Sequence, residues 1–224
     1  MSDIKDFEIE NGALIRYNGA SIQVEIPTGV TSIESFAFKD CKEIESIKIP
    51  KTVASIGYFA FSCCDSLEKI EVEEGCYEFR SEGNCVIKTG REVVVLGCKN
   101  SKIPESGTIV GIGNYAFSGC VMLDDIKIPS SIEFLGEGAF YGCAGLESVV
   151  LPDSVTCIGQ GAFKECYSLE SIVIPSSVAL ISRDVFDGCD EGLVIKAERD
   201  SVAEEYAKAN GIKVSHSIPS RTRL

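Results

Sequence analysis

Apolar residues recur at fixed positions along the chain, and prolines mark the period. Five prolines fall into two series with a spacing of 23 residues: Pro27 and Pro50, then Pro129, Pro152 and Pro175. Counted from each of them, aliphatic residues stand three and six positions on, a phenylalanine eleven on and a cysteine fourteen on. Pro104 begins a sixth copy with two additional residues, and a longer unit of 31 residues precedes it. This periodicity predicts a stack of similar units, because one unit alone cannot bury its apolar face.

Each unit contains two apolar segments with different spacings. After the cysteine comes the sequence aliphatic-x-x-aliphatic-x-aliphatic-Pro, as in Leu169, Ile172, Ile174 and Pro175. Residues two apart point to the same face of a strand, and proline ends the strand because it has no N–H to donate. The Gly-x-x-Ala-Phe-x-x-Cys segment has apolar residues three and four apart, which predicts a short helical or 3₁₀ turn on the opposite side of the coil. The predicted fold class is therefore an α/β repeat solenoid.

The repeat resembles that of a known family. Its motif IPSSVxxIGxxAFxxCxxLxxI is similar to the BspA-type leucine-rich repeats of bacterial and some protozoan surface proteins. The sequence LESIVIP at 169–175 matches the LxxLxL strand core of leucine-rich repeats in general. The resemblance extends over roughly residues 7–214. It implies a right-handed superhelix with a parallel β-sheet on one face, and a protein that adheres to host or partner proteins through that sheet face.

The segments that depart from the repeat predict caps and one interruption. Asn-Gly pairs at 11–12 and 18–19 predict the turns of an N-terminal hairpin, and the sequence at 79–104 predicts a second hairpin with strands over 85–88 and 92–96. A C-terminal capping helix is predicted over 200–211, with Ser201 and Glu204 as a capping box. Val202, Tyr206 and Ala209 share one predicted helical face, and a last strand is predicted over 212–214.

These features predict a single leucine-rich-repeat domain over 1–214, followed by a polar tail over 215–224. Within the domain we expect an N-terminal hairpin cap over 1–26, repeats over 27–72, a long repeat that contains the hairpin over 73–103, repeats over 104–197 and a C-terminal cap over 198–214.

The chain has 11 cysteines, and six of them occupy the same place in successive repeats: Cys41, Cys64, Cys120, Cys143, Cys166 and Cys189. Equivalent side chains in a stack point the same way, so their Cβ vectors are parallel and do not suit a disulfide. We interpret them as buried core thiols, with partial oxidation or metal binding as minor alternatives. The chain contains no Cys-x-x-Cys pair. A bridge among Cys76, Cys85 and Cys98 stays open.

Composition and charge exclude several classes of function. Hydrophobic residues make up 45% and charged residues 25% of the chain, as in folded globular proteins. The net charge of −13 argues against binding to nucleic acid or to anionic membranes, and no apolar run is long enough for membrane insertion. His216 is the only histidine, so no set of acid, base and nucleophile can be assembled. We therefore expect no enzymatic activity, no cofactor and no metal.

The outward-facing residues of the predicted strands form the candidate partner-binding face. One residue per repeat stands between the two core aliphatic residues of a strand: Glu25, Lys48, Glu71, Lys127, Val150 and Val173. In an in-register sheet they form one column, in which the first three alternate in sign and the two valines make a small exposed apolar patch. The patch would dock a partner or a second copy of the chain, although β-propensity on a sheet surface explains the valines equally well.

An acidic residue precedes each strand and forms a second column: Glu45, Glu68, Asp124, Glu147 and Glu170. Stacked like charges repel, so we expect these side chains to splay into water, with a cation-binding stripe as the alternative.

The predicted function is a non-catalytic protein–protein interaction module that binds a protein of unidentified nature. By its resemblance it is similar to bacterial surface adhesins, and the alternative is an intracellular interaction scaffold with reduced thiols. The beginning Met-Ser-Asp-Ile-Lys-Asp lacks the basic and apolar stretches of a signal peptide. The expected location is therefore the cytoplasm if this start is native, and the cell surface or the exterior, by resemblance, if a leader was removed.

Overall fold

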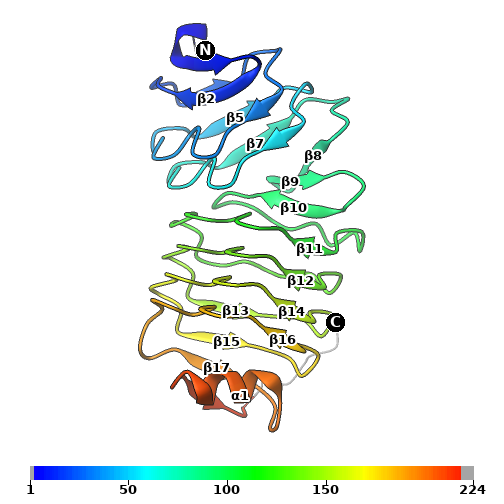
Figure 1. Ribbon diagram of the computed structural model, residues 1–224, viewed down its shortest axis with the longest axis vertical. Helices are drawn as coiled ribbons and strands as arrows, with labels where there is room; N and C mark the ends of the chain where they lie inside the picture. The colour runs from blue at the N-terminus through cyan, green and yellow to red at the C-terminus, as the bar shows by residue number, and fades with distance from the viewer. Residues whose placement is uncertain (1–2, 218–224) are drawn as a thin grey trace.

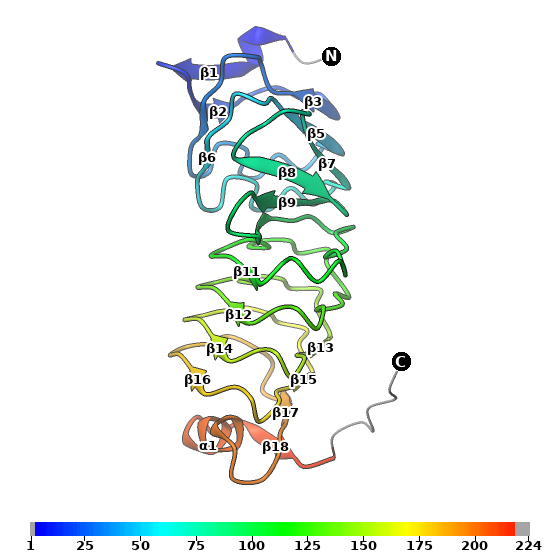
Figure 2. The same cartoon turned by 90° about the vertical axis from the view of Figure 1, so that its right-hand side faces the viewer.

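Successive repeats contribute strands to two faces of a continuous coil (Figures 1 and 2). The computed structural model describes residues 3–217. The first face carries the strands of the LxxLxL segments and one strand of the C-terminal cap, which is β18: β3 (Gln23–Glu25), β5 (Ser46–Ile49), β7 (Lys69–Val72), β13 (Ser148–Val150), β15 (Ser171–Val173), β17 (Val194–Lys196) and β18 (Lys213–Ser215). These strands pair in parallel within two separate sheets, β3-β5-β7 and β13-β15-β17-β18.

The second face carries a ladder that the repeat pattern did not predict. Its strands are β1 (Phe7–Glu10), β2 (Ala13–Tyr17), β4 (Ser32–Ile33), β6 (Ser55–Ile56), β8 (Phe79–Glu82), β9 (Cys85–Lys88), β10 (Val93–Leu96), β11 (Gly111–Ile112), β12 (Phe134–Leu135), β14 (Cys157–Ile158) and β16 (Leu180–Ile181). They form the sheets β1-β2-β4-β6 and β16-β14-β12-β11-β10-β9-β8. In the regular repeats these strands are only two residues long, and a segment this short shows no alternation of apolar and polar residues that would reveal it in the sequence.

The Gly-x-x-Ala-Phe-x-x-Cys segments form hydrogen-bonded turns beside the second face. In the repeat that contains Phe140, the Tyr141 N–H donates to the Gly138 carbonyl at 2.9 Å and the Cys143 N–H to the Phe140 carbonyl at 3.1 Å. These are the i→i−3 bonds of a 3₁₀ turn. Gly138 has a φ of +55°, in the left-handed region. This residue prevents the turn from continuing into a regular helix.

One phenylalanine stands at the same position of each regular repeat, and these rings stack into a ladder through the core. Phe38 stacks on Phe61 with 4.8 Å between ring centroids, and Phe140 lies 5.2 Å from both Phe117 and Phe163. Phe38, Phe117, Phe140 and Phe163 are fully buried. Each added repeat therefore covers the apolar face of the one before it, as stacking of units requires.

The long repeat interrupts this stack with three antiparallel strands. β8 pairs with β9 and β9 pairs with β10, and β10 returns to pair in parallel with β11. The side chains of β9 alternate between two hydrophobic clusters. Val86 belongs to the N-terminal cluster, whereas Cys85 and Ile87 belong to the C-terminal one, and all three are fully buried. β9 therefore lies between the N-terminal and the C-terminal hydrophobic clusters and packs against both.

Helix α1 (Val202–Ala209) covers the last repeat (Figure 1). The buried residues of the helix include Ala203 and Ala207, four apart on one face. The sequence-based assignment of Val202 and Ala209 to this face was wrong, since both are exposed. Two alanines make the contact because a small side chain lets the helix lie close to the stack, while the Tyr206 ring meets Phe186 with 6.0 Å between centroids.

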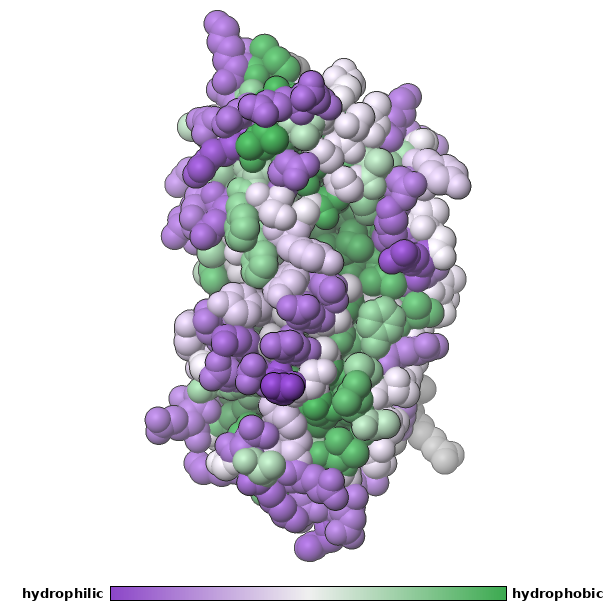
Figure 3. Space-filling model, viewed as in Figure 1, coloured by the Kyte–Doolittle hydropathy of each residue, from purple (hydrophilic) through white to green (hydrophobic). Residues whose placement is uncertain are grey.

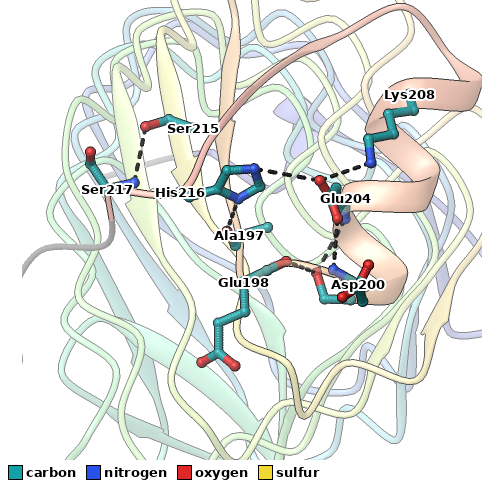
Figure 4. A network of polar contacts seen from close by, with 9 residues as sticks. Ala197, Glu198, Asp200, Glu204, Lys208, Ser215, His216 and Ser217 are labelled. Atoms are coloured by element: carbon teal, nitrogen blue, oxygen red, sulfur yellow. Dashed lines mark hydrogen bonds and ion pairs between the residues drawn. The ribbon is translucent and has the colours of Figure 1, made fainter.

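A polar network fixes this helix and the chain that follows it (Figure 4). The Ser201 Oγ accepts from the Glu204 N–H at 3.2 Å, which is half of the predicted capping box. The Glu204 carboxylate accepts from the Asp200 N–H at 2.7 Å instead of from the N-cap N–H, and it also contacts Lys208 Nζ at 2.8 Å and His216 Nε2 at 3.4 Å. Ser215, expected in the tail, pairs with Lys196 at the end of β18. Residues 218–224 of the predicted tail lie outside the described residues.

This network predicts how stability depends on pH. The Lys208 ammonium, followed by the Asp200 N–H, holds the pKa of Glu204 below its ordinary value. The carboxylate therefore stabilises the fold above the unfolded-state pKa, and this contribution is lost as the pH falls through the lower folded-state pKa. We expect Glu204→Gln to lower the melting temperature at pH 7 and to make it less sensitive to acidification between about pH 5 and pH 3, measured by circular dichroism.

Glu205→Gln is the matched control, since Glu205 is exposed on the same helical turn. Equal effects of the two substitutions at pH 7 would contradict this account of the cap.

Candidate functional site

The residues of the predicted partner-binding face do not form one continuous column. Glu25, Lys48 and Glu71 are in register across β3, β5 and β7, so side chains of opposite charge are neighbours along this sheet. Lys127 lies outside any strand, and its Nζ contacts Glu105 Oε1 at 2.7 Å. Two consecutive units without a first-face strand separate the two first-face sheets: the long repeat, whose chain forms β8, β9 and β10, and the repeat after Pro104, whose segment around Lys127 forms no strand. The expected six-residue column is therefore divided.

The predicted apolar patch on this face is also wrong in part. Val150 is 60% exposed, but Val173 is only 6% exposed. Lys196 is paired with Val173 in the ladder, and its Nζ donates to Ser171 Oγ at 3.2 Å. Because Ser171 and Val173 point to the same side of β15, the Lys196 side chain crosses that side of the strand. Val150 is left as a single exposed apolar residue.

The acidic column does not gather into a metal site. Glu68 contacts Lys99 Nζ at 3.1 Å, so one member of the column is neutralised by the long repeat. Within residues 3–217, no group of three His, Cys, Asp or Glu side chains is placed to hold a metal ion. The column is a row of solvated charges.

The cysteines of the repeat column act as hydrogen-bond donors in the core. The thiols of Cys64, Cys143, Cys166 and Cys189 donate to the carbonyl of the phenylalanine one repeat earlier, at 3.1 to 3.2 Å. Burial raises the pKa of Cys143 well above 9.0, so the thiol keeps its proton. All 11 cysteines are free, including Cys76, Cys85 and Cys98.

The long repeat has a shortened turn, and this creates a cleft. The Gly97 N–H donates to the Ala116 carbonyl at 2.8 Å, as the Phe117 N–H does to Ala139 in the next repeat. The Cys120 thiol, in turn, is 3.5 Å from the Gly97 carbonyl. Gly97 therefore occupies the place of the ladder phenylalanine, and it brings no ring. In this repeat the ladder position follows the second-face strand residue Val94 by three positions, whereas Phe61 follows Ile56 by five.

The neighbouring repeats meet across this shortened turn. The Cys63 N–H donates to the Gly119 carbonyl at 3.2 Å, past the long repeat. The Phe59 and Tyr115 rings meet with 4.4 Å between centroids, and the Tyr58 and Tyr115 rings with 5.2 Å. These three aromatic residues line a cavity of about 430 Å³, which we call the junction cleft. Figure 3 shows apolar residues in a hollow midway along the stack, in the region of β10 and β11.

The walls of the junction cleft combine apolar surface with a few polar groups. The apolar part of the walls includes Ile56 of β6, Val95 of β10 and Phe134 of β12. Lys88 and Arg91 of the hairpin also line the cleft, and so does Ser118. Ser118 is 6% exposed, and its Oγ has no hydrogen-bond partner. A volume of this size, with mostly apolar walls and a few polar groups, is typical of a binding site.

Two of the aromatic residues that line the cleft have a strained backbone. Phe59 has a φ of +59° and Tyr115 a φ of +56°. The same turn position carries Phe36 and Asp184 in two other repeats and glycine in the repeats of Gly138 and Gly161, and φ is positive in all of them. A bulky residue in this region costs about 1 kcal/mol or more relative to glycine, and such strain is found most often at functional sites. The Tyr115 hydroxyl donates to Glu137 Oε1 at 2.5 Å, and desolvation together with this carboxylate raises the pKa of Tyr115 to about 12.

Sequence analysis did not identify the junction cleft. One signal for it was present: the hairpin at 79–104, which replaces the regular turn of the repeat. This signal does not show that the flanking repeats close over the gap, because that contact depends on the three-dimensional path of the hairpin.

The two-faced coil with a phenylalanine ladder defines a leucine-rich-repeat solenoid. The chain matches the BspA type leucine rich repeat region in six copies, over residues 8–83 and 96–198, and it belongs to this family. No curated protein matches the sequence significantly. No helix in the described part of the chain has the length and apolar character needed to cross a membrane.

Solved structures share the fold. A leucine-rich repeat protein from Eubacterium ventriosum is 22% identical with a TM-score of 0.60, and the match covers 81% of this chain and 60% of that one. A leucine rich cell surface protein from Faecalibacterium prausnitzii is 26% identical with a TM-score of 0.51, over 86% of this chain and 56% of that one. The T. pallidum leucine rich repeat protein is 26% identical with a TM-score of 0.49, over 96% and 97%. The chain thus spans little more than half the length of the first two.

The environment of the thiols predicts their reactivity. Cys143 and Cys166 are fully buried, and desolvation raises the pKa of both. Because the thiolate is the reactive form, iodoacetamide should leave both unmodified in the native protein. Cys63 and Cys157 are partly exposed and should be alkylated first. Peptide mass spectrometry after timed alkylation measures the order, and unfolding in urea should make all four react alike. Early modification of Cys143 in the native state would show that the core opens.

Proposed function

We propose that this chain is a non-catalytic protein-binding module and that the junction cleft is its main contact surface. The observation that carries the proposal is the cleft itself, an open apolar site of about 430 Å³ at the one repeat that breaks the ladder. An exposed apolar surface of this kind stabilises a complex when a partner covers it. The repeats on both sides hold its walls rigidly, so little conformational entropy is lost on binding.

The finer proposal is adhesion to a host or partner protein at a cell surface. It is supported by membership of the BspA type family and by similarity to a protein described as a leucine rich cell surface protein. A role without chemistry is supported by the placement of the single histidine. His216 is engaged with Glu204 and with the Ala197 carbonyl at the C-terminal cap, and it does not line the cleft.

The first face is the second candidate surface. Its proposed contact residues are Glu25, Lys48, Glu71, Lys127, Val150 and Val173, and the exposure of Val150 favours it. Its charged members gain little from a partner, because exposed ion pairs contribute about 0–1 kcal/mol each. The junction cleft offers more apolar area, so we place the main contact there.

A pair of substitutions distinguishes the two surfaces. Val95→Trp fills the cleft from β10, and Val150→Asp places a charge on the first face. A binding protein would first be isolated by cross-linking and mass spectrometry with the intact chain, and its affinity then measured by biolayer interferometry. We expect Val95→Trp to weaken binding by about 30-fold or more and Val150→Asp to change it by less than about threefold.

Melting temperatures establish that both variants are folded. The reverse result, with binding lost in Val150→Asp and kept in Val95→Trp, would move the site to the first face. If no protein binds the intact chain specifically, the proposed function is wrong.

A further inference from the structure

We propose that the junction cleft binds an extended peptide segment of a partner protein, which adds a strand to the edge of β6. In this proposal one aromatic side chain of the segment enters the cavity, and an acidic side chain near it pairs with Arg91. The proposal rests on the protein-binding function and specifies its mode. Three independent features of the cleft support it: an open backbone edge, an unfilled side-chain pocket and an unpaired cation.

The open edge is the free side of β6. β6 pairs in parallel with β4, with Ser32 opposite Ser55 and Ile33 opposite Ile56, and it is the last strand of its sheet. The Gly57 N–H donates to the Ile33 carbonyl at 2.7 Å. In a parallel ladder successive residues direct their N–H and C=O to opposite sides, so those of Ile56 point away from β4. In the other repeats the next strand takes up these groups.

The strand that would continue this sheet is displaced. β10 occupies the equivalent place in the long repeat, but it pairs with β9 and β11 and not with β6. The backbone from Ala54 to Ser62 forms one wall of the junction cleft, and Val93 to Gly97 forms part of another. An exposed strand edge beside an apolar gap is the arrangement that strand addition uses, with main-chain hydrogen bonds for affinity and pockets for alternate side chains.

The side-chain pocket lies next to this edge. Phe59, Phe79, Tyr115 and Phe134 line it, and a further aromatic ring would have ring faces or edges to pack on. The Phe117 ring fills the space beside Gly97, so the cavity is not the place of the missing ladder ring but lies beside the shortened turn. The buried Ser118 Oγ has no partner within the described chain. Such a group costs free energy until a ligand or water bonds to it.

The charges at the cleft indicate an acidic residue in the segment. Lys88 pairs with Glu78 and lies 4.7 Å from the Phe79 ring centroid. Arg80 pairs with Glu92 at 2.7 Å. Arg91, on the same hairpin, makes no ion pair or side-chain hydrogen bond in the described chain. A carboxylate is its natural partner, because the guanidinium fork matches carboxylate geometry.

A second copy of this chain is a poorer occupant. The net charge of −13 makes the approach of two copies unfavourable. The β6 edge offers only a few hydrogen-bonding groups, which suits one short segment and not an extended sheet-to-sheet contact. A partner segment with an aromatic and an acidic residue satisfies all three features of the cleft together.

The probe is a phage-displayed library of random linear peptides, selected on the intact chain and counter-selected on the cleft-filled variant Val95→Trp. Synthetic copies of the selected peptides are then measured by fluorescence anisotropy. We expect an aromatic residue close to Asp or Glu in their sequences. N-methylation of alternate peptide bonds should weaken binding by about 30-fold in one register and by less than about threefold in the other, because only one side of an added strand bonds to β6.

The acidic contact has its own test. Arg91→Glu should weaken binding of the same peptides by about tenfold, and changing the peptide carboxylate to lysine should restore it. Arg199→Glu, which alters an exposed arginine near the C-terminal cap, is the matched control and should have no effect.

Several results would overturn the proposal. Selected peptides that bind Val95→Trp as well as the intact chain would show that the cleft is not their site. Equal tolerance of both N-methyl registers would exclude strand addition, even if a protein partner still requires an open cleft, in which case the protein-binding function stands. A concentration-dependent dimer in sedimentation velocity that is lost in Val95→Trp would assign the cleft to self-association instead.

Discussion

The phenylalanine ladder is the interaction on which the rest of the structure depends. Successive rings lie parallel at about one strand spacing, as Phe140 and Phe163 do at 5.2 Å. This contact fixes the position of each repeat relative to the last, and both sheets take their register from it. The thiol that follows each ring bonds to the carbonyl of the ring residue one repeat earlier, as Cys166 does to Phe140 at 3.2 Å. The same carbonyl also accepts from the Cys143 N–H at 3.1 Å, so the thiol adds a second hydrogen bond that joins two repeats in the core.

The junction cleft is the consequence of leaving one ring out. Gly97 keeps the backbone hydrogen bond of the ladder position but supplies no side chain, and the Phe117 ring lies where its Cβ would be. The core must then be closed in another way. β9 does this, with Val86 facing one cluster and Cys85 and Ile87 the other. It seals the two cores from each other but leaves the edge of β6 open on the second face.

The sequence predicted the parts of the structure that follow from repetition. The stack of repeats, the first-face strands and the capping helix follow from apolar residues that recur at a period of 23. It could not predict the parts that depend on which surfaces meet. Val173 has the same pattern position as Val150, yet Lys196 of the next repeat lies across it. The second-face strands of the regular repeats, such as β12 and β14, are two residues long and carry no signal of their own, whereas the hairpin strands β9 and β10 were predicted. The cleft requires the repeats on either side of the hairpin to touch, which no local pattern encodes.

The left-handed turn position carries different residues along the stack: Phe36, Phe59, Tyr115, Gly138, Gly161 and Asp184. Glycine at the left-handed turn position, as in Gly138 and Gly161, relieves the backbone and leaves an unremarkable surface. Phe59 and Tyr115 hold the same conformation at a cost, and their rings meet at the junction cleft. Stability alone would favour glycine at both positions. The aromatic contact closes the stack over the shortened turn and gives the cavity its wall. Phe36 and Asp184 hold the same conformation in regular repeats, so the strain alone does not mark the cleft. What distinguishes Phe59 and Tyr115 is that their rings meet across the long repeat and line an apolar cavity.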